Sequence, residues 1–526
     1  MDAEEQEAFY QSWLALDGAI AAQVQKYKQL DFPRKSTILH LLESLRRFGQ
    51  GHFQFFFFGF RLSYKDNKPG ARDPHLQDCS DYPAQDVLQG ILDQMGHDLE
   101  AITRAANQRI LASDDALSCL ANADKLAWLA VKPAINYAIV GEATTVLTYF
   151  QKAAEFYAIP YAQVAMIAIP YTCLSVDHRD YLAIPHEVGH YIYRHSIGAA
   201  RTAQEDLYDQ LDGPAGANKA NQAWLQSIFE ETCADIYGCL IAGPVMALDF
   251  QDLSQACSQD TFVYGDGQHP TPAIRPYIYT HVLASPSIKD LVIGDWTKIA
   301  QRLNARWKAR LKQRGVSDIG ISTISVSADR AASLPNEKVA TIKTVEQPID
   351  TIMNAKAAAS PETLGDLVPR IADAIINRIS GYVDQFGPAD KRTLTGWAGE
   401  ITSGTSVQSL YRRYQDGFLG LVAGVKVLPP EADPGSVEVT ADAPKAHTTA
   451  LWRDWLKNES GDSAILSAPE IPCGDKQDRG RPKPNTWAHI LLAGGWLTEG
   501  PSNEYTHPNE YTHPNEYTHP ERVQGI

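Results

Sequence analysis

The sequence predicts a mainly helical α+β fold. Long segments carry apolar residues at the spacing of an amphipathic helix, for example residues 5–30 and 366–379. Two short segments in the first third of the chain, residues 53–60 and 161–169, instead have the apolar composition of buried strands. The 526 residues are 44% hydrophobic and 21% charged, a globular composition, and they suffice for roughly two to four domains.

The N-terminal region, residues 1–155, is expected to form a mainly helical domain. A helix over residues 5–30 ends before Pro33, which cannot continue it. The aromatic run at residues 53–60 is predicted to be a strand within the core. Two or three amphipathic helices are expected within residues 84–157. No residue pattern in this region indicates chemistry.

The strongest functional signal is a His-Glu-x-x-His motif formed by His186, Glu187 and His190. Histidines four residues apart on a helix project from one face, so both imidazoles can bind one metal ion. Pro185 is tolerated only in a first turn, so this helix is expected to begin near Ala183 or Ile184. The flanking residues are uncharged, which predicts a buried helix, where unpaired imidazoles would be costly. The motif therefore favours a metal site at which Glu187 takes a proton from the metal's water.

A tetrahedral metal site needs a further protein ligand, and an apolar helical run within residues 224–250 offers one. Glu231 and Asp235 lie one turn apart on this run. Glu231 can complete a two-His, one-Glu site, while Asp235 accepts the outer N–H of a ligating histidine. Glu230 is the rival ligand, although the residue one turn after it is alanine, and Glu205 is a weaker alternative in the insertion between the two segments.

The His-Glu-x-x-His motif followed by Glu231-x-x-x-Asp235 resembles the gluzincin metallopeptidases, the group that includes thermolysin. A further segment from His269 to Arg275 is similar to the His-Pro…Arg element that follows the glutamate helix in several small intracellular gluzincins. The resemblance covers roughly residues 160–285. It implies a zincin-like domain, residues 156–315, in which a small mixed sheet lies beside the active-site helices.

Carried over by position, the resemblance implies a zinc ion with three protein ligands, His186, His190 and Glu231. It also implies Glu187 as the general base and Asp235 as the partner of a ligating histidine.

Three further residues are weaker candidates for a catalytic role. By the resemblance, His269 or Arg275 would contact the substrate or orient the site, and Tyr264 or His269 lies in a loop that could donate to a developing oxyanion. The strand at residues 161–169 would be an edge strand over the cleft that pairs with an extended peptide. The competing metzincin pattern does not fit, because His195 stands one position short of the third histidine's place.

These observations predict a zinc-dependent metallopeptidase that acts on a peptide or protein substrate. Two alternatives stay open: a binding or scaffold protein that keeps zinc for structure, and a zinc hydrolase of a non-peptide amide. A structural site is closed by four protein ligands, whereas a catalytic site leaves a position for water.

The net charge and the composition of individual segments indicate which kinds of partner and which cellular location to expect. A formal net charge of −16 argues against a nucleic-acid partner, which needs clustered Lys and Arg. The basic run Arg306–Arg314 is interpreted as the end of a helix that Asp295 caps and Gly315 stops. No secretion signal and no membrane span is recognisable, so a cytoplasmic location is expected, with non-classical export left open.

The C-terminal part is expected to combine helices with linkers. Residues 316–500 contain helical periodicity together with proline-rich connecting segments. Residues 501–526 contain three copies of Asn-Glu-Tyr-Thr-His-Pro, a repeat too short for a solenoid and too polar for a core, which predicts a disordered tail.

Overall fold

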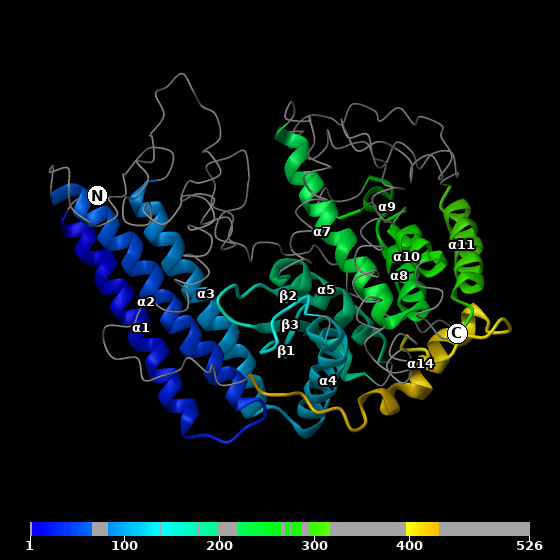
Figure 1. The fold of residues 1–526 in the computed structure, drawn as a ribbon, viewed down its shortest axis with the longest axis horizontal. Helices are drawn as coiled ribbons and strands as arrows, with labels where there is room; N and C mark the ends of the chain where they lie inside the picture. The colour runs from blue at the N-terminus through cyan, green and yellow to red at the C-terminus, as the bar shows by residue number, and fades with distance from the viewer. Residues whose placement is uncertain are drawn as a thin grey trace. The chain divides into compact units, whose positions relative to one another are not determined.

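The computed structural model describes residues 3–65, 83–136, 138–175, 178–197, 219–264, 269–270, 272–273, 275–286, 294–315 and 396–430 (Figure 1). These residues are mainly helical and include a small three-stranded sheet, which confirms the predicted fold class. In this part of the chain, no helix has both the length and the apolar character that crossing a membrane requires. The prediction for Glu205 lies outside the described residues, as do those for most of residues 316–500 and for the tail.

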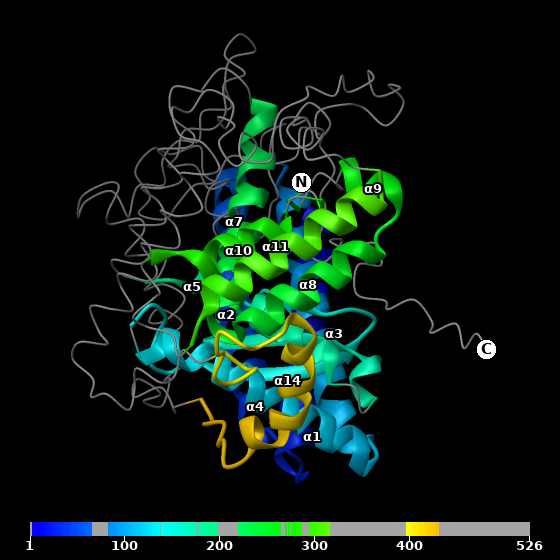
Figure 2. The same cartoon turned by 90° about the vertical axis from the view of Figure 1, so that its right-hand side faces the viewer.

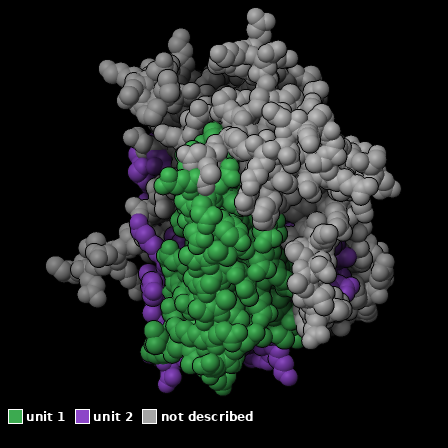
Figure 3. All heavy atoms as spheres, turned by 90° about the vertical axis from the view of Figure 1, so that its left-hand side faces the viewer, with its two compact units in different colours: residues 1–113, 158–164, 428–512 green, residues 114–157, 165–427, 513–526 purple. Residues whose placement is uncertain are grey.

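The chain divides into two compact units, which Figure 3 colours separately. Unit 1 comprises residues 1–113, 158–164 and 428–512, and unit 2 comprises residues 114–157, 165–427 and 513–526. The residues with candidate functions all belong to unit 2.

Unit 1 contains three long helices that pack against one another, α1 (Ala3–Lys28), α2 (Lys35–Lys65) and α3 (Ala84–Leu111). The aromatic run at residues 53–60 lies within α2, so the strand prediction was wrong. Phe53 and Phe57 are one helical turn apart, and their rings stack with centroids 5.4 Å apart. The ring of Phe53 also stacks on Trp13 of α1. Aromatic side chains at a four-residue spacing thus fill the space between two helices, and this packing overrides their strand propensity.

The sheet of unit 2 follows α4 (Asp114–Asn136) and has the strand order β1 (Thr145–Gln151), β3 (Val164–Pro170), β2 (Glu155–Tyr157). The helices α3 and α4 confirm the prediction of two or three helices within residues 84–157, and the strands β1 and β2 lie in the same range. β2 pairs antiparallel with β3, with Phe156 opposite Ile167.

The strand predicted at residues 161–169 exists as β3, but its predicted position at the edge of the sheet was wrong. β3 is the central strand, with β1 on one side and β2 on the other. A strand whose backbone is paired on both sides cannot add a further strand. The edge position belongs instead to β1 and β2, which the periodicity of the sequence did not distinguish from helix.

Two 3₁₀ turns, η1 (Tyr171–Leu174) and η2 (Arg179–Ala183), lead into the motif helix α5 (Ile184–His195), which begins where Pro185 predicts. The remaining helices are α7 (Lys219–Ala242), α8 (Pro244–Ala256), α9 (Gln259–Tyr264), α10 (Arg275–Ala284), α11 (Trp296–Gln313) and α14 (Val407–Val422). Helices α8, α10 and α11 lie side by side (Figure 2). The side chain of Asp295 caps α11, and Gly315 follows its end with a φ of 69°, as expected for the basic helix.

Candidate metal centre

Two glycines allow helices α5 and α7 to pack closely. A Cβ atom at Gly189 of α5 would lie 2.7 Å from Cα and 2.9 Å from the carbonyl oxygen of Ala234 in α7. A Cβ atom at Gly238 of α7 would lie 3.1 Å from the backbone nitrogen of His186. Because neither position has room for a side chain, the two backbones come near enough for the short side chain of a histidine to meet a glutamate across the interface.

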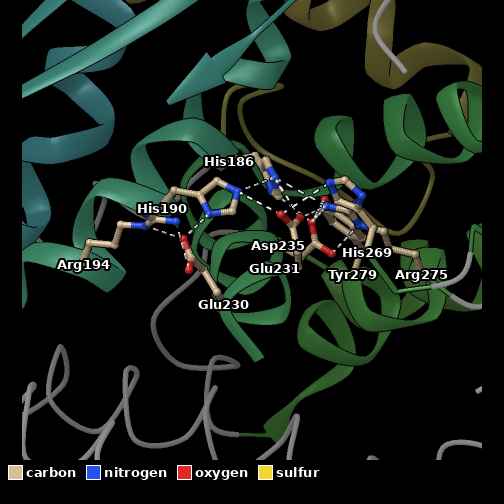
Figure 4. A network of polar contacts seen from close by, with 9 residues as sticks. All are labelled: His186, His190, Arg194, Glu230, Glu231, Asp235, His269, Arg275 and Tyr279. Atoms are coloured by element: carbon tan, nitrogen blue, oxygen red, sulfur yellow. Dashed lines mark hydrogen bonds and ion pairs between the residues drawn. The ribbon is translucent and has the colours of Figure 1, made fainter. Parts of the chain in front are cut away.

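The two motif histidines and Glu231 meet at this interface (Figure 4). The Nε2 atoms of His186 and His190 are 3.2 Å apart. His186 Nε2 lies 3.5 Å from Oε2 of Glu231, and His190 Nε2 lies 3.4 Å from its Oε1. In a tetrahedral zinc site with bonds of about 2.0–2.1 Å, neighbouring donor atoms are separated by roughly 3.3–3.4 Å. Each imidazole nitrogen therefore lies close to this spacing from the other nitrogen and from one oxygen of Glu231, and one donor atom from each residue lies within 4.8 Å of the others.

Asp235 lies behind His186, on the side away from the other histidine. Its Oδ1 is 3.0 Å from His186 Nδ1, although that nitrogen makes no well-directed hydrogen bond. Burial opposes a charge on His186, but the nearby carboxylates of Asp235 and Glu231 outweigh it and raise the pKa of His186 to about 10. A divalent cation bound at Nε2 would take the place of a proton on that nitrogen.

Glu230 lies beside Nδ1 of His190, as Asp235 lies beside Nδ1 of His186. Its Oε1 lies 3.1 Å from His190 Nδ1 and accepts a hydrogen bond of 2.8 Å from Nε of Arg194, one turn further along α5. Burial favours the neutral acid, but Arg194 and His190 outweigh burial and lower the pKa of Glu230 to about 2. The rival ligand of the sequence analysis thus contacts the outer nitrogen of a histidine and leaves Nε2 directed at the site.

Arg275 and His269 lie on the other side of Glu231. Nη2 of Arg275 donates to Oε2 of Glu231 at 2.8 Å, and Nε2 of His269 lies 3.5 Å from Oε1. Burial disfavours the ionised form of Glu231, but His269, His190 and Arg275 hold its pKa well below the usual value. Both candidates from the His-Pro…Arg segment therefore contact the carboxylate that would bind metal.

The formal charges of the centre favour a divalent cation. Four carboxylates lie on the two facing segments: Glu187, Glu230, Glu231 and Asp235. Among the described residues, two guanidinium groups pair with them, those of Arg194 and Arg275. The difference leaves two negative charges in a buried site, which neutral histidines do not offset and one divalent ion would.

Glu187 is held in α5 without a polar partner of its own. The residue is 3% exposed, and its side chain makes no hydrogen bond or ion pair within the described part of the chain. It follows His186 directly, about 100° around the helix. A buried carboxylate without a structural partner is available to exchange a proton with water or substrate.

His195 takes no part in this arrangement, and the prediction for the side chain of Tyr264 is not tested. His195 lies at the end of α5, where its ring stacks on Tyr191 and its Nδ1 is 3.0 Å from the Tyr191 carbonyl oxygen. Tyr264 is the last residue of α9, and its side chain lies outside the described part of the structure.

Two residues of the centre, Arg194 and Tyr279, were not recognised from the sequence, and Glu230 was considered there only as the less favoured ligand. A signal existed for both, because Arg194 follows His190 by four residues and Tyr279 follows Arg275 by four, which places each pair on one helix face.

Searches against protein-family models, curated proteins and solved structures return no match to this chain.

Proposed function

We propose that the chain is a zinc-dependent metallopeptidase of gluzincin type, with His186, His190 and Glu231 as the zinc ligands. The observation that supports this best is the close approach of the donor atoms on two helices whose glycines permit it. The two Nε2 atoms are 3.2 Å apart, His190 Nε2 lies 3.4 Å from Oε1 of Glu231, and His186 Nε2 lies 3.5 Å from Oε2. Two imidazoles and one carboxylate are the ligand set of many catalytic zinc sites.

The residues around the site have separate tasks in this proposal. When bound, zinc supplies Lewis acidity toward water and toward a carbonyl oxygen. Glu187 takes the proton of the attacking water and returns it to the amine that leaves. His269, beside Glu231 and 6% exposed, would donate a hydrogen bond to the oxygen of the scissile carbonyl. Asp235 and Glu230 hold the ligating histidines with Nε2 facing inward.

The number of donor atoms favours catalysis over a purely structural site. A closed structural zinc site has four protein ligands. Among the described residues three form a group close enough to share one ion, and His269 stands outside that group. A hydrolase of a non-peptide amide would use the same three ligands and the same base, so the substrate has to be identified by assay.

Metal analysis combined with a peptide-cleavage assay tests the proposal. The wild type is expected to contain one zinc per chain and to cleave members of a mixed peptide library. Glu187→Gln should keep the zinc and lose roughly 10²–10⁴-fold in kcat/KM, the usual contribution of a general base. Glu100→Gln is the matched control, because Glu100 is an exposed glutamate on α3 that pairs with Arg104.

Two results would contradict the proposal. A wild type without stoichiometric zinc would remove the metal centre, and a Glu187→Gln variant that cleaves at the wild-type rate would remove the assigned base.

A further inference from the structure

Tyr279 contacts the candidate centre without facing the metal position. It lies on α10, is fully buried, and its hydroxyl donates a hydrogen bond of 2.5 Å to Oδ1 of Asp235. The same oxygen lies 3.0 Å from His186 Nδ1. A single carboxylate oxygen thus connects a tyrosine hydroxyl to a metal-ligating histidine.

Helix α10 presents Arg275 and Tyr279 one turn apart on the face toward α7 (Figure 4). Arg275 binds both oxygens of Asp235, through Nε at 2.8 Å and Nη2 at 2.9 Å. Both side chains rest on Phe250 of α8: the guanidinium lies 4.5 Å from the ring centroid, and the tyrosine ring stacks at 4.6 Å. Both donors therefore also contact an aromatic ring, through a cation–π contact and a stacked ring, and these contacts do not depend on the carboxylate.

These contacts leave Asp235 little freedom. Its side chain is 0% exposed, so no solvent can replace a lost donor. Oδ1 accepts from Tyr279 and Arg275 and faces His186, while Oδ2 accepts from Arg275. The tyrosine hydroxyl adds a hydrogen bond to Oδ1 beside the two from Arg275, and so helps to hold the rotation of the carboxylate about its last bond. That rotation decides whether Oδ1 stays beside His186 Nδ1.

We infer that Tyr279 is a positioning residue of the metal centre: its hydroxyl orients Asp235, and Asp235 in turn orients His186 toward the metal. This inference rests on the proposed zinc centre and adds to it a residue on a third helix. Loss of the hydroxyl is expected to loosen His186 and weaken zinc binding, without removal of any ligand or of its direct partner.

The variant Tyr279→Phe tests this with a minimal change, because it keeps the ring stacked on Phe250 and removes one oxygen atom. Tyr237→Phe is the matched control. Tyr237 is a buried tyrosine on α7 whose hydroxyl donates a hydrogen bond of 2.6 Å to the carbonyl oxygen of Ala130, away from the centre. Both variants lose one buried tyrosine hydrogen bond. Because the bond of Tyr279 goes to a carboxylate and that of Tyr237 to a neutral carbonyl, the metal-free Tyr279→Phe protein should lose at least as much stability as the control.

Three measurements on the full chain separate the outcomes: zinc affinity by competition with a chromogenic chelator, the visible absorption spectrum of the Co²⁺-loaded protein, and thermal unfolding of the metal-free form. Tyr279→Phe is expected to bind zinc roughly tenfold more weakly, at the low end of the 10–100-fold range for partners of metal ligands. Its cobalt spectrum should change in shape. Tyr237→Phe should bind zinc as the wild type does and leave the cobalt spectrum unchanged.

Each failure has its own pattern. If the wild type binds zinc and Tyr279→Phe binds it equally well or more tightly, Tyr279 has no positioning role. If both tyrosine variants weaken zinc binding equally, the effect is general destabilisation, and the inference is again overturned. If the wild type binds no zinc, the proposed function itself fails.

Discussion

Replacement of Gly189 by alanine is expected to change the distance between helices α5 and α7 without changing any polar group of the candidate centre. The new Cβ atom would lie 2.7 Å from Ala234 Cα, whereas carbon atoms in contact are normally about 3.5–4.0 Å apart. Since the close atoms belong to the backbone of α7, no side-chain rotation relieves the clash. Helix α5 must move away from α7 by roughly 1 Å.

The energy of this clash sets the size of the expected effect. Overpacking of this kind costs about 1–3 kcal/mol, and alanine regains about 0.5–1 kcal/mol of helix stability over glycine. The metal-free variant is therefore expected to fold with a modest loss of stability, with its two helices slightly parted. Zinc binding has to restore the close approach, so the zinc affinity should fall roughly 10- to 100-fold.

Competition titration with a zinc chelator measures this affinity, and chemical unfolding of the metal-free protein measures stability. Gly417→Ala in α14 is the matched control, because a Cβ atom there meets nothing within 4 Å. It should gain about 0.5–1 kcal/mol of stability and leave the zinc affinity unchanged. A Gly189→Ala variant that binds zinc as tightly as the wild type would refute the claim that this close approach brings the ligands together.

The remaining predictions concern the ligands and the ion. Glu231→Gln should reduce zinc affinity far more than Glu230→Gln, because the first change removes a ligand and the second removes only the partner of His190. For Glu230→Gln a 10–100-fold loss of affinity is expected. Equal losses of affinity in a zinc titration would contradict the assignment of Glu231 as the ligand. Zinc at 100 times its Kd should stabilise unit 2 by about 2.7 kcal/mol, so chelation should lower its Tm by roughly 4 °C in calorimetry. A Tm that does not respond to chelation would argue against a folded zinc site.

Whether the sequence predicts a feature correctly depends on how far apart along the chain the interacting residues are. The histidine motif, the start of α5 at Pro185 and the cap of α11 at Asp295 depend on residues within one or two turns, and the structure has them as predicted. The aromatic run at residues 53–60 was misread, because strand propensity is a local preference and Trp13, some forty residues away, decides the outcome. The position of β3 in the sheet was predicted wrongly for the same reason, because periodicity does not distinguish a central strand from an edge strand.

The sequence by itself determined which side chains are able to form a metal centre, since the spacing of four residues on a helix places His186 with His190 and Glu231 with Asp235. Only the tertiary structure decided how the two helices face each other and therefore which acid meets which nitrogen. Glu230 and Glu231 are neighbours in the chain, and about 100° of helix rotation directs one toward Nδ1 and the other toward Nε2 of His190. That rotation is fixed by the contact between Gly189 and Ala234, which no local pattern encodes.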